Sequence, residues 1–148
     1  MSEVTFNGET HILSLTDQNG AVLGNWHANN RTTSQATLQF VPNDDYEVED
    51  QNEPHTHNPK DDSADGEYGS FGIIRFNVPG HDGVGIHSGR QNSPDLTPER
   101  GIGPEHVTQG CIRTTDAAMA VIVQAMRNDP LVVVHVEENR NQRQPELA

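Results

Sequence analysis

The side chains best suited to covalent chemistry lie in one stretch, from Gly85 to Asp116. Cys111 is the only cysteine of the chain, and it follows Gly110 in a turn-like sequence. His87 closes a short apolar run upstream, where a strand end would hold its imidazole rigidly. A thiol beside an imidazole and a helix N-terminus is a nucleophile for acyl transfer. We therefore predict that Cys111 is the nucleophile and His87 its general base; the alternative is a buried, unreactive thiol.

Backbone groups beside Cys111 are suited to stabilising an oxyanion. Because Gly110 has no Cβ, N–H groups around this turn can approach a substrate oxygen closely. A helix is predicted to begin near Thr115, and the positive end of its dipole would favour the thiolate form of the cysteine. Another histidine close in sequence, His106, is the competing candidate for the base.

Basic residues are concentrated near these groups, although the chain is strongly acidic. The formal net charge is −13 at pH 7, and four of the nine basic residues lie in the predicted site region: Arg75, Arg90, Arg100 and Arg113. A locally cationic pocket suits a substrate that carries carboxylates, whereas the alternative for each arginine is an ordinary surface position. The overall negative charge argues against nucleic acid and against an anionic membrane surface as partners.

The pattern of apolar residues predicts a β-rich chain. Strands are predicted at Val4–Phe6, His11–Leu15, Ala21–His27, Thr37–Val41, Ser70–Val78, Val84–His87 and Leu131–Val136. The turn residues Asn7-Gly8 predict a hairpin with a primed turn between the first two strands. Ser70–Val78 is predicted to be central in the sheet, and the almost wholly apolar run Leu131–Val136 is also placed in its interior.

One main helix is predicted after the cysteine. Thr114-Thr115-Asp116 supplies a threonine cap with an acidic first turn, and Asn128-Asp129-Pro130 ends the helix. Its core-facing stripe is predicted to consist of Ala118, Val121, Ile122 and Ala125.

The length of 148 residues is that of one domain, which we place at residues 1–138, with a polar tail at 139–148. Residues 42–69 hold ten of the 22 acidic residues and are dense in Asn, Pro and Gly. This composition cannot bury enough apolar surface to fold alone, so an acidic loop or lid is predicted there. His55-Thr56-His57 lies in this segment, but two histidines make a poor metal site, and we expect no metal and no cofactor.

The site region also carries a family resemblance. Gly85-Ile86-His87-Ser88, followed by Thr108-Gln109-Gly110-Cys111-Ile112-Arg113, resembles the catalytic signature of the L,D-transpeptidases, the YkuD-like family. The resemblance implies a sandwich-like fold of β-rich mixed sheets. It also implies that Ser88 orients His87 through its backbone carbonyl, and that Gly110 and Cys111 supply oxyanion donors. Arg113 would hold a substrate carboxylate or brace the loop, and Arg90, Thr108 and Gln109 complete the substrate-binding set.

Gln109 departs from the family pattern, in which a second histidine usually occupies this position. A glutamine can donate a hydrogen bond but cannot shuttle a proton, so the way in which the acyl acceptor is deprotonated stays open. The implied reaction is acyl transfer on peptidoglycan stem tetrapeptides, with release of D-Ala and transfer to an amine, a D-amino acid or water. The alternatives are another cysteine amidase or peptidase that acts on the cell wall, and a non-catalytic wall-binding module.

The N-terminal sequence MSEVTFNGETHILSL has neither a basic n-region nor an apolar h-region, so a signal peptide is not predicted. No apolar run approaches the roughly 20 residues of a membrane span, and membrane insertion is not expected. Small members of this kind resemble the antibacterial L,D-transpeptidase-like effectors exported by type VI secretion. We therefore expect synthesis in the cytoplasm and export to a target periplasm, with a secretion component and a cognate immunity protein as partners.

Overall fold

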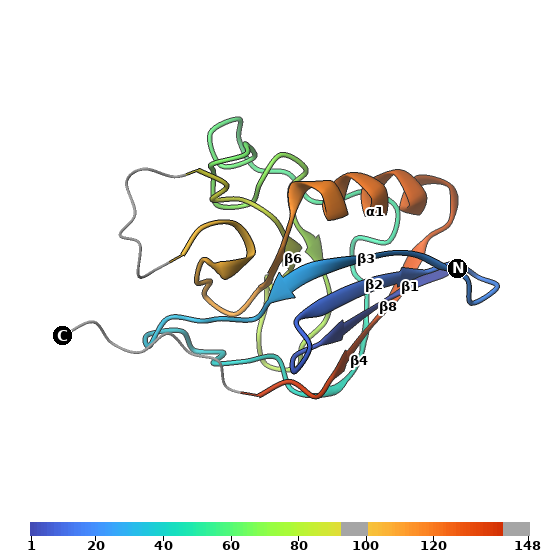
Figure 1. Ribbon diagram of the computed structural model, residues 1–148, viewed down its shortest axis with the longest axis horizontal. Helices are drawn as coiled ribbons and strands as arrows, with labels where there is room; N and C mark the ends of the chain where they lie inside the picture. Colours follow the sequence, from blue (N-terminus) through green and yellow to red (C-terminus); the bar gives the residue numbers. More distant parts are fainter. Residues whose placement is uncertain (93–100, 141–148) are drawn as a thin grey trace.

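The computed structural model describes residues 1–92 and 101–140. Within these residues, eight strands form one mixed sheet in the order β4-β8-β1-β2-β3-β7-β6-β5, with the helix α1 beside it (Figure 1). The elements are β1 (Ser2–Asn7), β2 (Ile12–Thr16), β3 (Val22–Asn29), β4 (Asp44–Glu47), β5 (Ile74–Arg75), β6 (Gly85–His87), the 3-10 helix η2 (Gly103–Glu105), β7 (Ile112–Thr114), α1 (Asp116–Asn128) and β8 (Leu131–Glu137). The predicted β-rich fold with one main helix after Cys111 is confirmed.

The first two strands form the predicted hairpin. β1 and β2 pair antiparallel, and the core receives their alternate side chains, Val4, Phe6, Leu13 and Leu15. The predicted primed turn at Asn7-Gly8 is wrong, because four residues connect the strands. The Asn7 side chain accepts hydrogen bonds from the N–H groups of Glu9 and Thr10, both at 2.9 Å, and these bonds stabilise the longer connection.

The strand β8 lies inside the sheet, as predicted. It pairs parallel with β1 and antiparallel with β4, and Leu131, Val134 and Val136 are buried. Both edges of β8 are hydrogen-bonded, and the remaining residues of the run, Val132, Val133 and His135, are partly buried.

The helix α1 begins and ends where the sequence predicts. Ala118 donates its N–H to Thr115 Oγ1 at 3.0 Å, so Thr115 is the N-cap. The buried face is displaced from the predicted stripe and consists of Ala118, Met119, Ile122, Val123 and Met126. Val121 was predicted to face the core but is 41% exposed. Within residues 1–92 and 101–140, no helix has the length and apolar character needed to cross a membrane.

The segment Thr37–Val41 is not the strand that was predicted. Leu38 and Val41 are buried in the core, but side chains rather than a neighbouring strand bind the backbone of this segment. Thr32 Oγ1 donates to the carbonyl of Gln39 at 2.6 Å, and Asn30 Oδ1 accepts the N–H of Val41 at 2.7 Å. The apolar spacing therefore reflected burial and not a β-ladder.

The run Ser70–Val78 was predicted at the centre of the sheet, and this is wrong. Only Ile74–Arg75 forms a strand, β5, and it lies at the sheet edge. The run is nevertheless apolar because the acidic segment covers this edge through two isolated bridges, Val48–Phe76 and His55–Ile73. Covered in this way, an edge has the burial of an interior strand.

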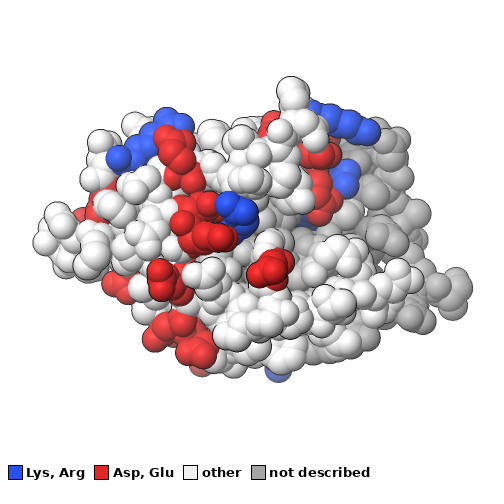
Figure 2. Space-filling view, turned by 180° about the vertical axis from the view of Figure 1, so that it is seen from behind, with Lys and Arg blue, Asp and Glu red and all other residues white. Residues whose placement is uncertain are grey.

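The acidic segment 42–69 takes up defined structure by pairing with the rest of the fold. Its first part forms β4, and its later part is a series of turns that ends at Gly69. Gly69 has φ of 77°, and a Cβ there would collide with Ser88 Oγ, so glycine permits the close approach of this segment to β6. Acidic side chains gather over part of the face shown in Figure 2, with isolated basic groups among them.

Candidate active site

The two strands β6 and β7 bring the predicted nucleophile and base to one face of the sheet. They pair parallel, with Ile86 opposite Ile112 and His87 opposite Arg113. Both isoleucines are fully buried. Since side chains alternate along a strand, His87 and Arg113 lie on the opposite face from the isoleucines, and the same alternation predicts that face for Cys111, which immediately precedes β7.

The Cys111 residue is partly exposed, but the surroundings of its sulfur favour the thiol over the thiolate. Sγ lies 3.7 Å from the carbonyl oxygen of Gly83. Burial raises the pKa of Cys111 to about 11, although a backbone hydrogen bond from Gly85 and the nearby Arg113 favour the thiolate. Those favourable contacts do not offset the loss of hydration.

The predicted position of Cys111 at the mouth of the helix is wrong. The strand β7 separates the cysteine from Thr115, the cap of α1. Three residues of strand span about 10 Å, whereas the effect of a helix dipole falls off within its first turn. The helix therefore contributes little to activating the thiol.

The imidazole of His87 is buried and neutral, with a defined tautomer. His87 is 1% exposed, and its Nδ1 lies 2.8 Å from the carbonyl oxygen of Ser88. Because a carbonyl only accepts, Nδ1 carries the proton and Nε2 is left as an acceptor. Burial, assisted by the positive charge of Arg113, lowers the pKa of His87 to about 3. Burial therefore favours a neutral imidazole, and not an imidazolium, at this position of the folded protein.

Arg113 is a brace that holds the base and its surroundings. Its side chain is fully buried, and Nε donates to the same carbonyl of Ser88 at 3.2 Å. Other donors of this guanidinium bond the carbonyl of Val107 at 3.1 Å and the carbonyl of Glu67 at 2.9 Å. Of the two roles expected from the sequence, carboxylate holder or brace, this burial favours the brace.

Two residues near His87 also bind other side chains of the protein. Ser88 Oγ donates to Asp116 Oδ1, which ties the end of β6 to the start of α1. His106, the competing candidate for the base, is buried with Nδ1 2.8 Å from Arg113 Nη1. Burial and that guanidinium lower the pKa of His106. An imidazole packed behind Arg113 does not face a substrate.

The turn before Cys111 is held by hydrogen bonds to side chains. Gly110 has φ of 138°, which disfavours other residues, and its N–H donates to Thr108 Oγ1 at 3.2 Å. The same hydroxyl donates to the carbonyl of Cys111 at 2.7 Å. Asn30, fully buried, donates from Nδ2 to the carbonyls of Gly110 at 2.9 Å and Cys111 at 3.1 Å.

These contacts leave the backbone N–H of Cys111 as a candidate donor to an oxyanion. The N–H of Gly110, expected from the sequence to be such a donor, is taken by Thr108. Among the residues that the structure describes, none accepts a hydrogen bond from the N–H of Cys111. Asn30, which sequence reasoning missed, anchors this turn from 80 positions away in the chain. No local motif marks it.

Comparison with known proteins identifies the family. Residues 18–134 match the YkuD model, the L,D-transpeptidase catalytic domain. The chain belongs to this family.

Three solved structures share the fold of this L,D-transpeptidase domain. The helical cell shape determining protein Pgp2 from Campylobacter jejuni has 18% identity and a TM-score of 0.63, over 94% of this chain and 48% of that one. L,D-transpeptidase 1 from Mycobacterium tuberculosis has 15% identity and a TM-score of 0.53, over 91% and 60%. An L,D-transpeptidase from Stackebrandtia nassauensis has 12% identity and a TM-score of 0.57, over 95% and 57%. The chain thus spans about half to three fifths of these longer chains, and no curated protein matches it significantly.

The remaining residues predicted to bind substrate in this L,D-transpeptidase domain differ in their access to solvent. Gln109 is exposed, and its Oε1 accepts a bond from Thr33 Oγ1 at 3.4 Å. Thr108 is buried inside the turn, so it positions the turn rather than facing solvent. Arg90 is partly exposed, and its Nη2 donates to Glu67 Oε2 at 2.8 Å, which neutralises its charge. Arg100 lies outside the described residues.

The acidic segment contributes an aromatic cluster that sequence reasoning missed. The ring of Tyr68 meets His87 edge-on, with centroids 5.2 Å apart, and stacks on His57 at 3.9 Å. His55 meets His57 edge-on at 4.9 Å. Burial raises the pKa of Tyr68, and the negative charge of Glu67 acts in the same direction. The available signal was an aromatic residue directly before Gly69 at the end of the acidic segment.

Proposed function

We propose that this domain transfers acyl groups of peptidoglycan stem tetrapeptides through a thioester on Cys111. The observation that carries the proposal is the tautomer of His87. Its Nδ1–H is held by the carbonyl of Ser88, which leaves Nε2 as the acceptor that we assign as the base for Cys111. Membership of the L,D-transpeptidase catalytic domain family supports the same chemistry.

The first half of the reaction forms the thioester. Nε2 of His87 takes the proton of the Cys111 thiol as Sγ attacks the carbonyl of the third stem residue, a diamino acid. The N–H of Cys111 donates to the oxyanion that develops. When the intermediate collapses, the amine of the terminal D-Ala leaves with the proton that His87 had taken. A neutral Cys111–His87 pair suits this order of steps, because the proton moves only as the carbon–sulfur bond forms.

The second half transfers the acyl group. An amine of another stem, a free D-amino acid or water attacks the thioester, His87 accepts its proton, and the thiolate leaves and is reprotonated. Arg113 keeps its place throughout, since it fixes the carbonyl that fixes the tautomer of His87. Gln109 at the solvent edge can donate a hydrogen bond to the acceptor but cannot deprotonate it.

The test is product analysis on a defined disaccharide tetrapeptide, with mass spectrometry to identify the bond that is cut. Cys111→Ala is expected to abolish release of D-Ala, and His87→Gln to slow it about 10²- to 10⁴-fold. Asp17→Asn, in the exposed turn before β3, is the matched control and should match the wild type. Release of D-Ala that is unaffected by Cys111→Ala contradicts the proposal. Loss of a different bond would assign a cysteine amidase or peptidase instead.

A further inference from the structure

The amide of Asn30 uses all of its hydrogen-bonding positions. Its Nδ2 donates to the carbonyl oxygens of Gly110 at 2.9 Å and Cys111 at 3.1 Å. Its Oδ1 accepts the N–H of Val41 at 2.7 Å and an N–H of Asn139 Nδ2 at 3.0 Å. An amide side chain has two N–H donors and an oxygen with two lone pairs, so each is occupied. Turning this fully buried amide over would set its oxygen against two carbonyls, and the partners on both sides therefore fix its orientation.

Asn139 reaches this amide because the chain turns inward directly after β8. Glu138 has φ of 50°, a left-handed conformation that is uncommon for residues other than glycine. The next residue, Asn139, is buried, and its Nδ2 also donates to the carbonyl of Val41 at 2.9 Å. Asn43 holds the backbone of Asn139, because its Oδ1 accepts the N–H at 2.7 Å and its Nδ2 donates to the carbonyl at 3.2 Å. A Cβ on Gly8 would lie 2.5 Å from the Cα of Asn139, so glycine leaves the room that this position needs.

The carbonyl of Gly110 belongs to the same peptide group as the N–H of Cys111. A trans peptide group is planar, and its C=O and N–H point in opposite directions. Gly110 has φ of 138° and no Cβ, so no side chain of its own restricts rotation of this group. Asn30 binds the carbonyl oxygen at 2.9 Å and therefore fixes the direction in which the N–H of Cys111 points.

We propose that Asn139 is a positioning residue for the candidate oxyanion donor, the N–H of Cys111, and that it acts through Asn30. The inference rests on the proposed function, in which an oxyanion forms beside Cys111. Without the side chain of Asn139, Asn30 Oδ1 keeps only the N–H of Val41, and the carbonyl of Val41 loses its donor at 2.9 Å. Buried acceptors that lack partners are costly, so Asn30 is no longer held in one orientation, and neither is the peptide group that it binds. The loss falls on the transition state, where the oxyanion forms, and it lowers kcat rather than raising KM.

Two variants of Asn139 and one double variant test this chain of contacts. Asn139→Ala removes the donor to Asn30. Asn139→Asp keeps the size of the side chain but sets an acceptor oxygen against Asn30 Oδ1 and the carbonyl of Val41. The double variant combines Asn139→Ala with Asn30→Ala, and Asn30→Ala alone completes the cycle.

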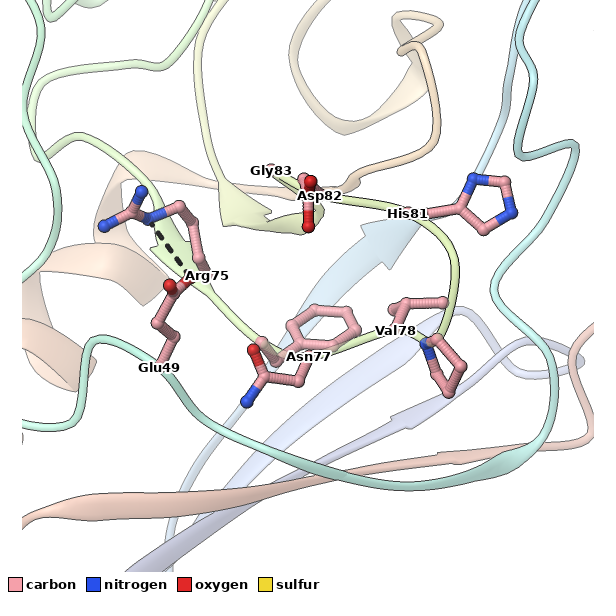
Figure 3. A pocket seen from close by; sticks show the side chains of 9 residues that line it. Glu49, Arg75, Asn77, Val78, His81, Asp82 and Gly83 are labelled. Carbon is pink, nitrogen blue, oxygen red and sulfur yellow. Dashed lines mark ion pairs between the residues drawn. The ribbon is translucent and has the colours of Figure 1, made fainter.

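Asn77 supplies the matched controls, Asn77→Ala and Asn77→Asp. It is an exposed asparagine in the turn between β5 and β6, and it lines the cavity that Figure 3 shows. Gly83 lines the same cavity, and its carbonyl oxygen lies 3.7 Å from Cys111 Sγ. These controls therefore repeat both changes of side chain in another segment that reaches the sulfur, and they should match the wild type.

The measurements are kcat and KM for D-Ala release, the rate of acylation of Cys111 by a carbapenem, and the rate of its alkylation by iodoacetamide, a reaction that forms no oxyanion. Asn139→Ala is expected to lower kcat and the acylation rate about fivefold to tenfold, with KM and alkylation within about twofold of the wild type. Asn139→Asp should lose more than Asn139→Ala. In the Asn30→Ala background, Asn139→Ala should cost no further acylation rate, since it acts through Asn30.

Wild-type kcat and acylation rate in Asn139→Asp would overturn the inference. So would losses that multiply in the double variant, or equal losses in acylation and alkylation, because both indicate a general structural role. The amplitude of the carbapenem reaction counts folded molecules, so a lower rate is distinguished from partial unfolding. Persistence of D-Ala release in Cys111→Ala would contradict the proposed function instead, whereas carbapenem acylation tests Asn139 without the peptide substrate.

Discussion

The ionisation of Cys111 is the property on which the chemistry depends, and pH is the perturbation that tests it. Burial raises the pKa of this thiol from 9.0 to about 11. This rise of two units in pKa lowers the thiolate fraction at neutral pH about 100-fold. Well below the pKa, the thiolate fraction changes about tenfold for each unit that separates the pH from the pKa. At pH 7 the folded protein therefore holds about one thiolate in 10⁴ molecules, against about one in 10² for an ordinary thiol.

Alkylation by iodoacetamide measures this fraction, because only the thiolate reacts. Its rate in the folded protein should rise through pH 10 and be about 100-fold below that of the same cysteine in urea at pH 7. The urea-unfolded chain is the matched control, since it has the same sequence without the burial. A rate that levels off between pH 5 and pH 7, as for a cysteine held as thiolate, would refute the reasoning.

The variant His87→Gln separates the resting thiol from the reacting one. If His87 ionised Cys111 before substrate binds, this variant would lower the alkylation rate at pH 7. The neutral pair predicts that alkylation changes by less than about twofold, whereas acyl transfer falls about 10²- to 10⁴-fold. Because the pKa of His87 is lowered to about 3, the base stays unprotonated in mild acid, and kcat/KM should not fall with a midpoint near pH 6.5.

Three further outcomes follow from contacts in the fold. Asn30→Ala should slow acylation of Cys111 by a carbapenem more than about tenfold, because that reaction needs the ordered turn. Alkylation by iodoacetamide does not need the turn and should keep its rate. Equal losses in both reactions would reduce Asn30 to a structural role. Thr115→Ala removes the cap of α1 and should lower the free energy of unfolding by about 1 kcal/mol in urea titrations, with Thr115→Ser restoring most of it. Burial alone would lower the pKa of His135, but its hydrogen bonds to two carboxylates outweigh burial and raise the pKa. The contribution of His135 to the free energy of unfolding is therefore complete below pH 6.5 and is lost as the pH rises through the raised pKa. The variant His135→Gln should flatten that part of the stability curve, and an unchanged slope would contradict the assignment.

Local sequence was sufficient for the elements whose structure depends on near neighbours. The threonine cap at Thr115 and the stop at Pro130 set the bounds of α1. The apolar run Leu131–Val136 predicted an interior strand, and β8 is indeed paired on both edges, with Leu131, Val134 and Val136 buried. The signature around His87 and Cys111 indicated the family, since the residue types and their order are local properties.

Only the tertiary structure decided the state of the candidate catalytic groups. Whether Cys111 is ionised depends on how much water its sulfur loses, and that is set by chain segments far away in sequence. The same holds for Asn30, which reaches the catalytic turn from another part of the sheet, and for Tyr68, which the acidic segment places against His87. A pattern of residue types records which groups are present. Hydration and long-range hydrogen bonds depend on where the whole chain places them, and these determine whether the groups carry charge and what they touch.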